Sequence, residues 1–272
     1  MMKLCANIDY FEKNIGMVQA SNVLRKAGFE YVDYTPKLVD FQWRVFDKEF
    51  TTLCDHGLKV YQSHAPFNRY GKYESIEEHM RLVELSLEAA ARSGAKYLVV
   101  HGDEFEATRC YNPEATKLYN YELFAPIVEQ AVKKGVNIAF ENVFQDDLSI
   151  PRYGSIAEEL AALIDMFSCP QVCCCWDFGH GAVAYPQGQQ DAIEILGNRI
   201  QCTHVHDNYL ESDMHLIPML GKINWTECMK VFNAVSKTEV FSFELVYGNV
   251  TDETAYPLAQ LLYAIGCKLV AD

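Results

Sequence analysis

Residues 76–101 read IEEHMRLVELSLEAAARSGAKYLVVH and contain the unit from which most of the chain is built. The first part has apolar residues at three- and four-residue spacing (Met80, Val83, Leu87 and Ala90), which predicts a helix over residues 76–91. Gly94 suits the left-handed residue that ends a helix. The apolar run from Tyr97 then predicts a buried strand that ends in His101.

The same order of strand, loop, helix and glycine recurs along the sequence, with glycines before the next strand also at Gly28, Gly57 and Gly135. Eight apolar or β-branched runs are predicted as strands: Leu4–Ile8, Tyr31–Tyr34, Leu58–Ser63, Tyr97–His101, Val136–Glu141, Val172–Asp177, Ile200–His206 and Val240–Val246. Eight such units in about 270 residues predict an α/β fold, a single (β/α)8 TIM barrel over residues 1–272. A doubly wound sheet usually has fewer strands and often a glycine-rich loop after the first one, where this chain has Ile8-Asp9-Tyr10-Phe11.

The composition excludes several classes of protein. Lys and Arg number 23 against 37 Asp and Glu, a net charge of −14, which disfavours a protein that grips nucleic acid or an anionic membrane surface. No uncharged apolar run approaches the ~18–20 residues of a membrane span, and the N-terminus does not resemble a signal peptide. Ten cysteines without a C-x-x-C pair indicate reduced, buried thiols in a cytoplasmic protein.

Polar residues mark the ends of six consecutive predicted strands: His64, His101, Glu141, Asp177, His204 and Glu244. The loops after three of these ends add His180, His206-Asp207 and Asp213-x-His215. Any one of these residues could instead be a loop histidine, a helix cap or a salt-bridge partner. Barrel closure would bring all six strand ends to one mouth, where clustered carboxylates repel one another unless a cation lies between them. Histidine and carboxylate ligands suit Mn, Mg, Co, Fe or Zn ions.

These residues resemble the xylose-isomerase-like TIM barrels, which include sugar and sugar-phosphate isomerases and epimerases, inosose and dehydroshikimate dehydratases, and endonuclease-IV-type abasic-site nucleases. The likeness spans nearly the whole chain. It rests on Phe140-Glu141-Asn142, Trp176-Asp177-x-x-His180, His204-Val205-His206-Asp207-Asn208, and Asp213-Met214-His215-Leu216-Ile217-Pro218 through Gly221-x-Ile223-Asn224-Trp225. One position departs from the family pattern, because a Gly-x-Gly in the last motif reads Met219-Leu220-Gly221 here.

The resemblance implies roles for particular residues. By analogy with the ketose epimerases, Glu141, Asp177, His204 and Glu244 would hold one metal ion, and Glu141 and Glu244 would move the proton. His180 would contact the substrate, and we expect the same of Trp176 and His206. The epimerases have an arginine six residues after the metal histidine, where this chain has Leu210.

The nucleases of the family hold three zinc ions, and their additional ligands match His64, His101, His180, Asp213 and His215. Ligand identity therefore leaves the nuclease branch open. The segment Trp176-Asp177-Phe178-Gly179-His180, where the nucleases have a DTCH pattern, and the acidic composition both disfavour it.

The most favoured function is a metal-dependent isomerase or epimerase of a sugar, sugar phosphate or related polyol-ketone, which abstracts a proton next to a carbonyl through a metal-stabilised enediolate. The alternatives are a dehydratase of the inosose or dehydroshikimate type, the tri-zinc nuclease, and a binding protein without turnover. We expect a small carbohydrate as partner, with no nucleic acid or membrane and with homo-oligomers common among proteins of this shape.

Aromatic and basic residues near the strand ends are candidates for substrate contacts. The aromatic ones are Phe67, Tyr70, Phe105, Tyr111, Phe144, Trp176, Phe178, Tyr209 and Tyr247. Because Trp176 and Phe178 flank Asp177, at least one of them is expected to face the mouth. Arg69, Lys72, Arg109 and Arg152 lie in loops on the same face, where any of them could bind a phosphate or carboxylate, although a solvated surface charge is the commoner outcome for each.

Overall fold

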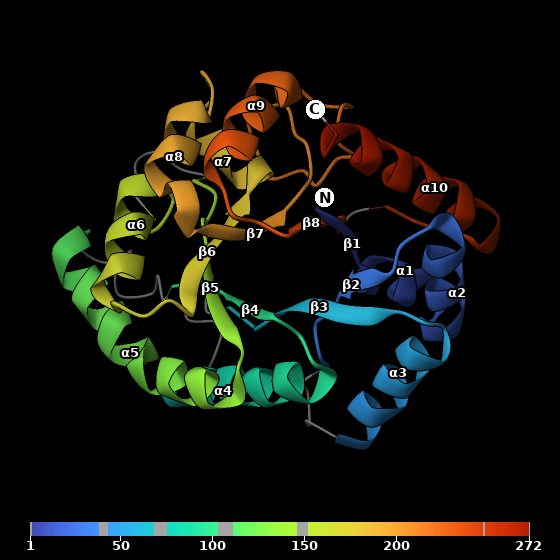
Figure 1. Cartoon of the computed structure of the whole chain (residues 1–272), viewed down its shortest axis with the longest axis horizontal. Helices are drawn as coiled ribbons and strands as arrows, with labels where there is room; N and C mark the ends of the chain where they lie inside the picture. The colour runs from blue at the N-terminus through green and yellow to red at the C-terminus, as the bar shows by residue number, and fades with distance from the viewer. Residues whose placement is uncertain are drawn as a thin grey trace.

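The computed structural model describes residues 2–37, 43–67, 75–102, 111–145, 152–246 and 248–271. Eight parallel strands form one sheet in the order β7-β6-β5-β4-β3-β2-β1-β8. Their bounds are β1 Lys3–Asn7, β2 Tyr31–Asp33, β3 Lys59–His64, β4 Tyr97–Val100, β5 Asn137–Glu141, β6 Val172–Asp177, β7 Ile200–His204 and β8 Val240–Phe243. All eight predicted strands are present, and Figure 1 shows them as a ring inside a layer of helices.

The ring closes between β7 and β8, where Val205 and Phe243 form a parallel bridge. The Val205 amide donates to the Ser242 carbonyl at 2.8 Å, and the Glu244 amide donates to the Val205 carbonyl at 3.1 Å. The predicted TIM barrel is therefore confirmed. Parallel pairing around a closed ring brings the carboxyl ends of all eight strands to one end of the barrel, which is where such folds place their active sites.

The helices surround the ring and follow the strands along the chain (Figure 1). Their bounds are α1 Ile8–Ile15, α2 Met17–Ala27, α3 Trp43–Asp55, α4 Ile76–Ser93, α5 Pro113–Lys134, α6 Ala157–Met166, α7 Phe178–Ala184, α8 Gln190–Leu196, α9 Trp225–Val235 and α10 Asp252–Leu269. Helix α4 begins after Ser75, whose hydroxyl accepts from the Glu78 amide at 3.1 Å, and ends at Gly94 with φ +73°. Gly94 thus has the left-handed conformation expected from the sequence.

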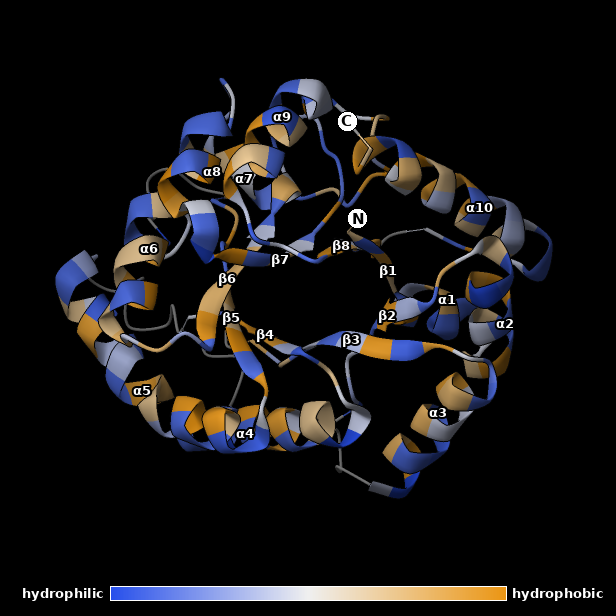
Figure 2. Ribbon diagram, in the orientation of Figure 1, coloured by the Kyte–Doolittle hydropathy of each residue, from blue (hydrophilic) through white to orange (hydrophobic). Residues whose placement is uncertain are grey.

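Alternation along the strands separates the core into two layers. On β6, Cys173 and Cys175 point inside the barrel, where they pack with Cys5, Cys202 and Tyr97. Cys174 and Trp176 point outward into the larger layer between strands and helices. Figure 2 shows hydrophobic residues along the strands and alternating with hydrophilic ones along the surrounding helices, as a layered core requires.

The nine described cysteines are free thiols, as the spacing predicts. Six are buried, but Cys54 and Cys267 are exposed and Cys169 is half-buried, so the expectation of burial holds only for the barrel cysteines and Cys228. Among the described helices, none combines the length and the apolar composition needed to cross a bilayer.

Candidate metal centre and active site

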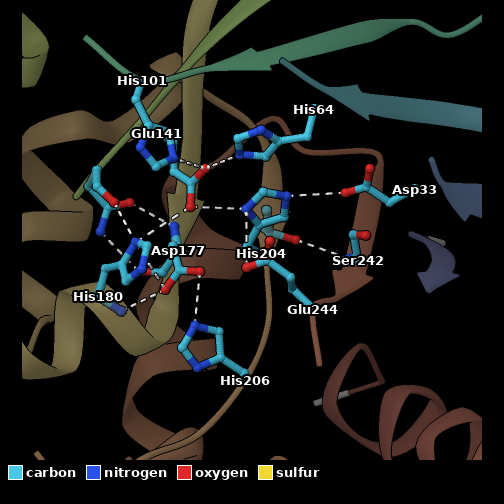
Figure 3. A network of polar contacts seen from close by, with 12 residues as sticks. Asp33, His64, His101, Glu141, Asp177, His180, His204, His206, Ser242 and Glu244 are labelled. Atoms are coloured by element: carbon cyan, nitrogen blue, oxygen red, sulfur yellow. Dashed lines mark hydrogen bonds and ion pairs between the residues drawn. The ribbon is translucent and has the colours of Figure 1, made fainter. Parts of the chain in front are cut away.

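The predicted ligands meet at the carboxyl end of the barrel. His64, Glu141, Asp177 and His204 are the last residues of β3, β5, β6 and β7, while His101 and Glu244 come one residue after β4 and β8. Figure 3 shows their side chains converging on the region above the strands, with Glu141 between the imidazoles of His64, His101 and His204. Strand ends that are distant in sequence thus place six polar side chains around one space.

Among the residues that the structure describes, three groups have ligand atoms close enough together to hold a metal ion. The groups are Glu141, Asp177, His204 and Glu244 (the principal group); His180, His206, Asp213 and His215 (the second group); and His64, Glu141 and His204. Within each group, one ligand atom per residue lies within 4.8 Å of the others. The principal group has the four residues predicted from the sequence.

His204 shows why the principal group fits a cation. Its imidazole is fully buried, and its Nδ1 lies 3.0 Å from Glu141 Oε1 and 3.7 Å from Glu244 Oε2. This Nδ1 has no hydrogen-bond partner among the described residues. A buried nitrogen that faces two carboxylates without a hydrogen bond is a suitable ligand for a divalent ion, and the carboxylate, imidazole and carboxylate donors suit Mn, Mg, Co, Fe or Zn.

Asp33, at the end of β2, orients His204 from the side away from the principal group. Its Oδ2 lies 3.1 Å from His204 Nε2 (Figure 3). The same Oδ2 accepts from Gln62 Nε2 at 2.7 Å. A carboxylate at Nε2 keeps the proton on that nitrogen and leaves Nδ1 as the free ligand atom. The sequence interpretation missed Asp33 because it placed this residue inside the second strand; a carboxylate near the end of that strand was the available signal.

The second group is built from the α7 turn and the segment after β7. Asp213 Oδ2 lies 3.1 Å from His215 Nε2 and 3.5 Å from His180 Nε2, and Asp213 Oδ1 lies 3.6 Å from His206 Nε2. The imidazoles of His206 and His215 stack with their centroids 3.9 Å apart. His206 is fully buried, is not among the described residues that line the cavity below, and its Nε2 lies 3.1 Å from Asp177 Oδ2, so the structure places it beside both groups and its predicted substrate contact stays a prediction.

Asn142 joins the two groups. Its side chain accepts from the Asp177 amide at 2.6 Å and donates to the Asp177 carbonyl at 3.0 Å, which fastens β5 to β6. Its carbonyl accepts from His180 Nδ1 at 2.8 Å, so His180 Nε2 faces Asp213. His180 lies in the first turn of α7 rather than in a loop, and Asp177 caps that helix by accepting from the His180 amide at 2.6 Å. Asp177 therefore caps α7 and is also a member of the principal group.

Glu141 is shared between the principal group and the third one. His64 Nε2 and His101 Nε2 both lie 3.0 Å from Glu141 Oε2, while Oε1 faces His204. Burial opposes ionisation of this carboxyl, but the nearby imidazoles of His204 and His101 outweigh it and hold the pKa of Glu141 well below its usual range. Glu141 is thus a carboxylate in the metal-free protein.

In the second group, the pKa values of two histidines are shifted upward. Burial disfavours the charged imidazole of His180, but Asp177 and Asp213 outweigh it and raise its pKa to about 10. For His215, Asp213 and Glu244 overcome the same burial effect and raise the pKa to about 9. The carboxylates therefore stabilise positive charge here, either as protons on the histidines or as a bound cation.

A cavity of about 280 Å³ opens onto the ligand groups. Its described lining comprises His64, Phe67, His101, Glu141, Val143, Phe144, Arg152, His180, Asp213, His215, Glu244 and Val246. Phe67 and Phe144, two of the predicted aromatic contacts, therefore line the site. Arg152 also lines the site. It is only 3% exposed, so the expectation that it is a solvated surface charge is wrong. Tyr70, Phe105, Tyr247, Arg69, Lys72 and Arg109 lie outside the described residues.

Trp176 and Phe178 do not face the mouth. Trp176 is fully buried between the strands and the helices, where its Nε1 donates to Gln189 Oε1 at 2.8 Å. Phe178 packs against Trp225, Phe232 and Phe241 in the same layer. The predicted substrate contact of Trp176 is contradicted, because the pleat that turns Asp177 into the barrel turns its neighbour Trp176 outward.

The chain belongs to the family of xylose isomerase-like TIM barrels, whose model matches residues 22–263. It is 23% identical over 283 residues to the uncharacterized protein y4fM of Sinorhizobium fredii (strain NBRC 101917 / NGR234), a match that covers 93% of this chain and 88% of that protein. The sequence-based resemblance to the family is thus confirmed.

Solved structures of the same fold include enzymes of more than one kind. A crystal structure of IolI protein with a zinc atom superposes with a TM-score of 0.80 at 16% identity, covering 99% of this chain and 98% of that one. A D-psicose 3-epimerase crystallised with D-fructose gives a TM-score of 0.76 at 12% identity, with full coverage of both chains. An AP endonuclease, family 2, from Brucella melitensis gives 0.73 at 16% identity, covering 95% of this chain and 98% of that one. At these identities the likeness establishes the fold.

Proposed function

We propose that the chain is a divalent-metal-dependent isomerase or epimerase that moves a proton next to the carbonyl group of a sugar, a sugar phosphate or a related polyol-ketone. The observation that carries this proposal is the principal group, in which Glu141 and Glu244 reach from two different strands to within 4.8 Å of each other and of Asp177 and His204. The similarity in fold to a D-psicose 3-epimerase supports the same class of reaction.

A bound divalent cation would supply positive charge to the substrate's carbonyl and hydroxyl oxygens as negative charge develops on them. Glu141, Asp177, His204 and Glu244 would hold it. Glu141 or Glu244 would remove the proton from the carbon next to the carbonyl, and the same or the other glutamate would return it. Return to the neighbouring carbon gives isomerisation, whereas return to the opposite face of the same carbon gives epimerisation.

The cavity suits a small substrate. Its volume of about 280 Å³ is just below the range of roughly 300–1,000 Å³ typical of small-molecule sites. Phe67 stacks on His101 with centroids 4.7 Å apart, and Phe144 stacks on His180 at 5.7 Å. These rings place apolar surface beside the ligands, which keeps water away from a carbanion-like intermediate.

A second candidate function is a phosphodiesterase with several metal ions. The observation that favours it is the presence of ligands beyond those one ion needs: the four residues of the second group, and His64 beside Glu141 and His204. The net charge of −14 disfavours a nucleic-acid substrate for such an enzyme.

Solvent exchange tests the proposed reaction directly. Metal-loaded protein is incubated in deuterated water with a panel of ketoses, aldoses and their phosphates, and deuterium incorporation, product configuration and loss of water are measured by NMR. We expect deuterium next to the carbonyl of at least one substrate, and Glu244→Gln should abolish this incorporation. The matched control is Glu239→Gln, at the opposite end of the barrel, which should retain it.

Exchange by Glu244→Gln at the wild-type rate would contradict the assignment of the base. Incision of an abasic DNA duplex by the metal-loaded protein, without exchange on any sugar, would favour the second candidate.

A further inference from the structure

The loop between β7 and α9 carries two members of the second group, Asp213 and His215, and its backbone is strained around them. Four described residues other than glycine have positive φ angles, and three of them lie in this loop: Leu210 (+71°), His215 (+47°) and Met219 (+72°). A residue with a Cβ adopts this left-handed region at a cost in free energy. Contacts within the folded protein must therefore hold the loop in this shape.

Asp207 is at the centre of these contacts. The residue is fully buried, and four N–H groups donate to its carboxylate. Oδ1 accepts from the amides of Asn208 at 2.9 Å and Ile223 at 3.2 Å. Oδ2 accepts from the Met219 amide at 2.9 Å and from Trp225 Nε1 at 2.8 Å. Three of the four donors lie 12 to 18 residues further along the chain, so one carboxylate fastens the far end of the loop.

The backbone of Asp207 fixes the middle of the loop. Its amide donates to the Leu216 carbonyl, and the Leu216 amide donates to the Asp207 carbonyl, both at 2.8 Å. Leu216 directly follows His215, whose Nδ1 lies 3.0 Å from the carbonyl oxygen of Glu244. His215 is therefore held from two sides, through the bonds of its neighbour to Asp207 and through the backbone after β8.

The loop packs so closely around Asp207 that position 221 has no room for a side chain. A Cβ added to Gly221 would lie 2.2 Å from Asp207 Oδ1 and 2.4 Å from the Asn208 carbonyl oxygen. Asn208 in turn connects the loop to α7, because its Nδ2 donates to the Gly179 carbonyl at 2.8 Å. Gly179 precedes His180, so these contacts join the two segments that supply the second group.

We propose that Asp207 is a positioning residue for the second group. It holds the strained loop where Asp213 and His215 meet the two histidines from outside the loop, His180 and His206. In this position the oxygens of Asp213 lie 3.1 to 3.6 Å from all three imidazoles. Three imidazoles and one carboxylate suit Zn²⁺. The role requires that a cation binds to the second group, and it does not depend on the reaction proposed above.

Asp207→Asn tests this role with little change in volume. The amide keeps one acceptor oxygen, but in either orientation its NH₂ group faces two N–H donors, so two of the four bonds are lost. We expect Zn²⁺ to bind to the second group about 10- to 100-fold more weakly, the usual loss when a residue that orients ligands is changed, and the principal group to keep its affinity. Affinities are measured by titration against a chromophoric chelator. The matched control, Glu211→Gln, removes an exposed carboxylate from the same loop and should bind Zn²⁺ like the wild type.

A double-mutant cycle separates positioning from general stability. His215→Ala removes a ligand of the second group, so Asp207→Asn should not weaken Zn²⁺ binding further in that background. A residue that only stabilises the fold would instead lower the urea midpoint of the metal-free protein in both backgrounds and leave the Zn²⁺ affinities unchanged. Wild-type affinity of Asp207→Asn at the second group, or an equal loss at both groups, would overturn the proposal. A wild type that binds only one Zn²⁺ would overturn it too.

Trp225→Phe is the second variant, for the case in which Asp207→Asn does not fold. It removes one N–H donor to Asp207 and keeps an aromatic ring beside Phe178, whose centroid lies 5.3 Å from that of Trp225. We expect Zn²⁺ to bind about 2- to 10-fold more weakly at the second group only, the effect of one hydrogen bond. An unchanged affinity at this group would then overturn the proposal.

This proposal and the proposed function fail separately. Zn²⁺ binding that depends on Asp207, in a protein that exchanges no deuterium into any sugar, would support the positioning role and contradict the proposed reaction. Deuterium exchange in a protein whose second group binds no ion would do the reverse.

Discussion

The imidazole of His204 lies between two carboxylates. Its Nε2 is 3.1 Å from Asp33 Oδ2, and its Nδ1 is 3.0 Å from Glu141 Oε1. All three side chains are almost completely buried. Asp33 thereby selects the nitrogen that faces the principal group, and its own orientation is set by Gln62. The orientation of His204 at the end of β7 thus depends on Asp33 at the end of β2, a strand that is not a neighbour of β7 in the sheet.

Asp33→Asn should weaken metal binding at the principal group by about 10- to 100-fold, the usual effect of losing a carboxylate that orients a ligand histidine. An asparagine can still accept from His204, but it no longer carries the charge that strengthens the imidazole as a ligand. Metal affinity is measured by competition with a chromophoric chelator. An unchanged affinity, with the fold intact by circular dichroism, would show that the charge of Asp33 does not strengthen His204 as a ligand.

Binding of a divalent ion to the second group should release about two protons near pH 7.5. In the metal-free protein, neighbouring carboxylates raise the pKa of His180 to about 10 and that of His215 to about 9, so both imidazoles carry a proton that a metal ion must displace. Affinity should therefore rise with pH until about pH 10, where both imidazoles have lost their protons. Calorimetric titrations in buffers of different ionisation enthalpy count the protons, and a count of zero would contradict the assignment.

Gly179→Ala should disrupt the second group selectively. A Cβ at this position would lie 1.9 Å from Cε1 of His206 and 2.3 Å from its Nδ1, so the imidazole would have to move. The principal group does not include His206. Its member Asp177 loses the contact between its Oδ2 and His206 Nε2 (3.1 Å) but still accepts from the His180 amide, so this group should keep its ion. Elemental analysis of purified variant and wild type compares the number of ions per chain. Equal numbers, with at least two ions in the wild type, would exclude a ligand role for His206.

Glu239→Gln provides a pH-dependent stability test remote from the site. Glu239 accepts from Tyr61 at 2.6 Å and from Lys96 at 2.9 Å, and these bonds lower its pKa from 4.5 to about 2. The folded state thus favours the carboxylate, so the stabilisation is fully present above pH 4.5 and is lost as the pH falls through about 2. Since the side chain is 52% exposed, the variant should cost at most ~1 kcal/mol at pH 7.

Urea unfolding at pH 7 and pH 2.5 measures this difference between Glu239→Gln and wild type. A destabilisation that is the same at both pH values would contradict the linkage. Sugar exchange activity should be unaffected, because Glu239 lies at the amino end of β8.

The fold and most candidate ligands could be predicted from sequence because both follow short-range patterns. Strand period, helix period and the glycine before each strand located the eight strands, and the strand ends located Glu141, Asp177, His204 and Glu244. Trp176 was misplaced although the information was available. The alternation that turns Cys173 and Cys175 into the barrel also turns Asp177 inward and Trp176 outward.

The burial of Arg152 and the grouping of His206 with Asp213 and His215 had no comparable local signal. Arg152 owes its position to a backbone tie between its segment and the loop after β5, and such contacts depend on the complete fold. Asp33 does have a local signal, a carboxylate near the end of a predicted strand, but its contact with His204 forms only when β2 and β7 face the same barrel interior.

The central claim is that the principal group holds a divalent ion, and metal content per chain tests it most directly. Elemental mass spectrometry is performed on protein purified without added metal or chelator, and again after reloading. The account predicts at least one divalent ion per chain in wild type and in Glu239→Gln, and loss of at least one ion in a Glu141→Gln, Asp177→Asn double variant. Wild-type protein that contains no divalent ion, even after reloading, would contradict the account.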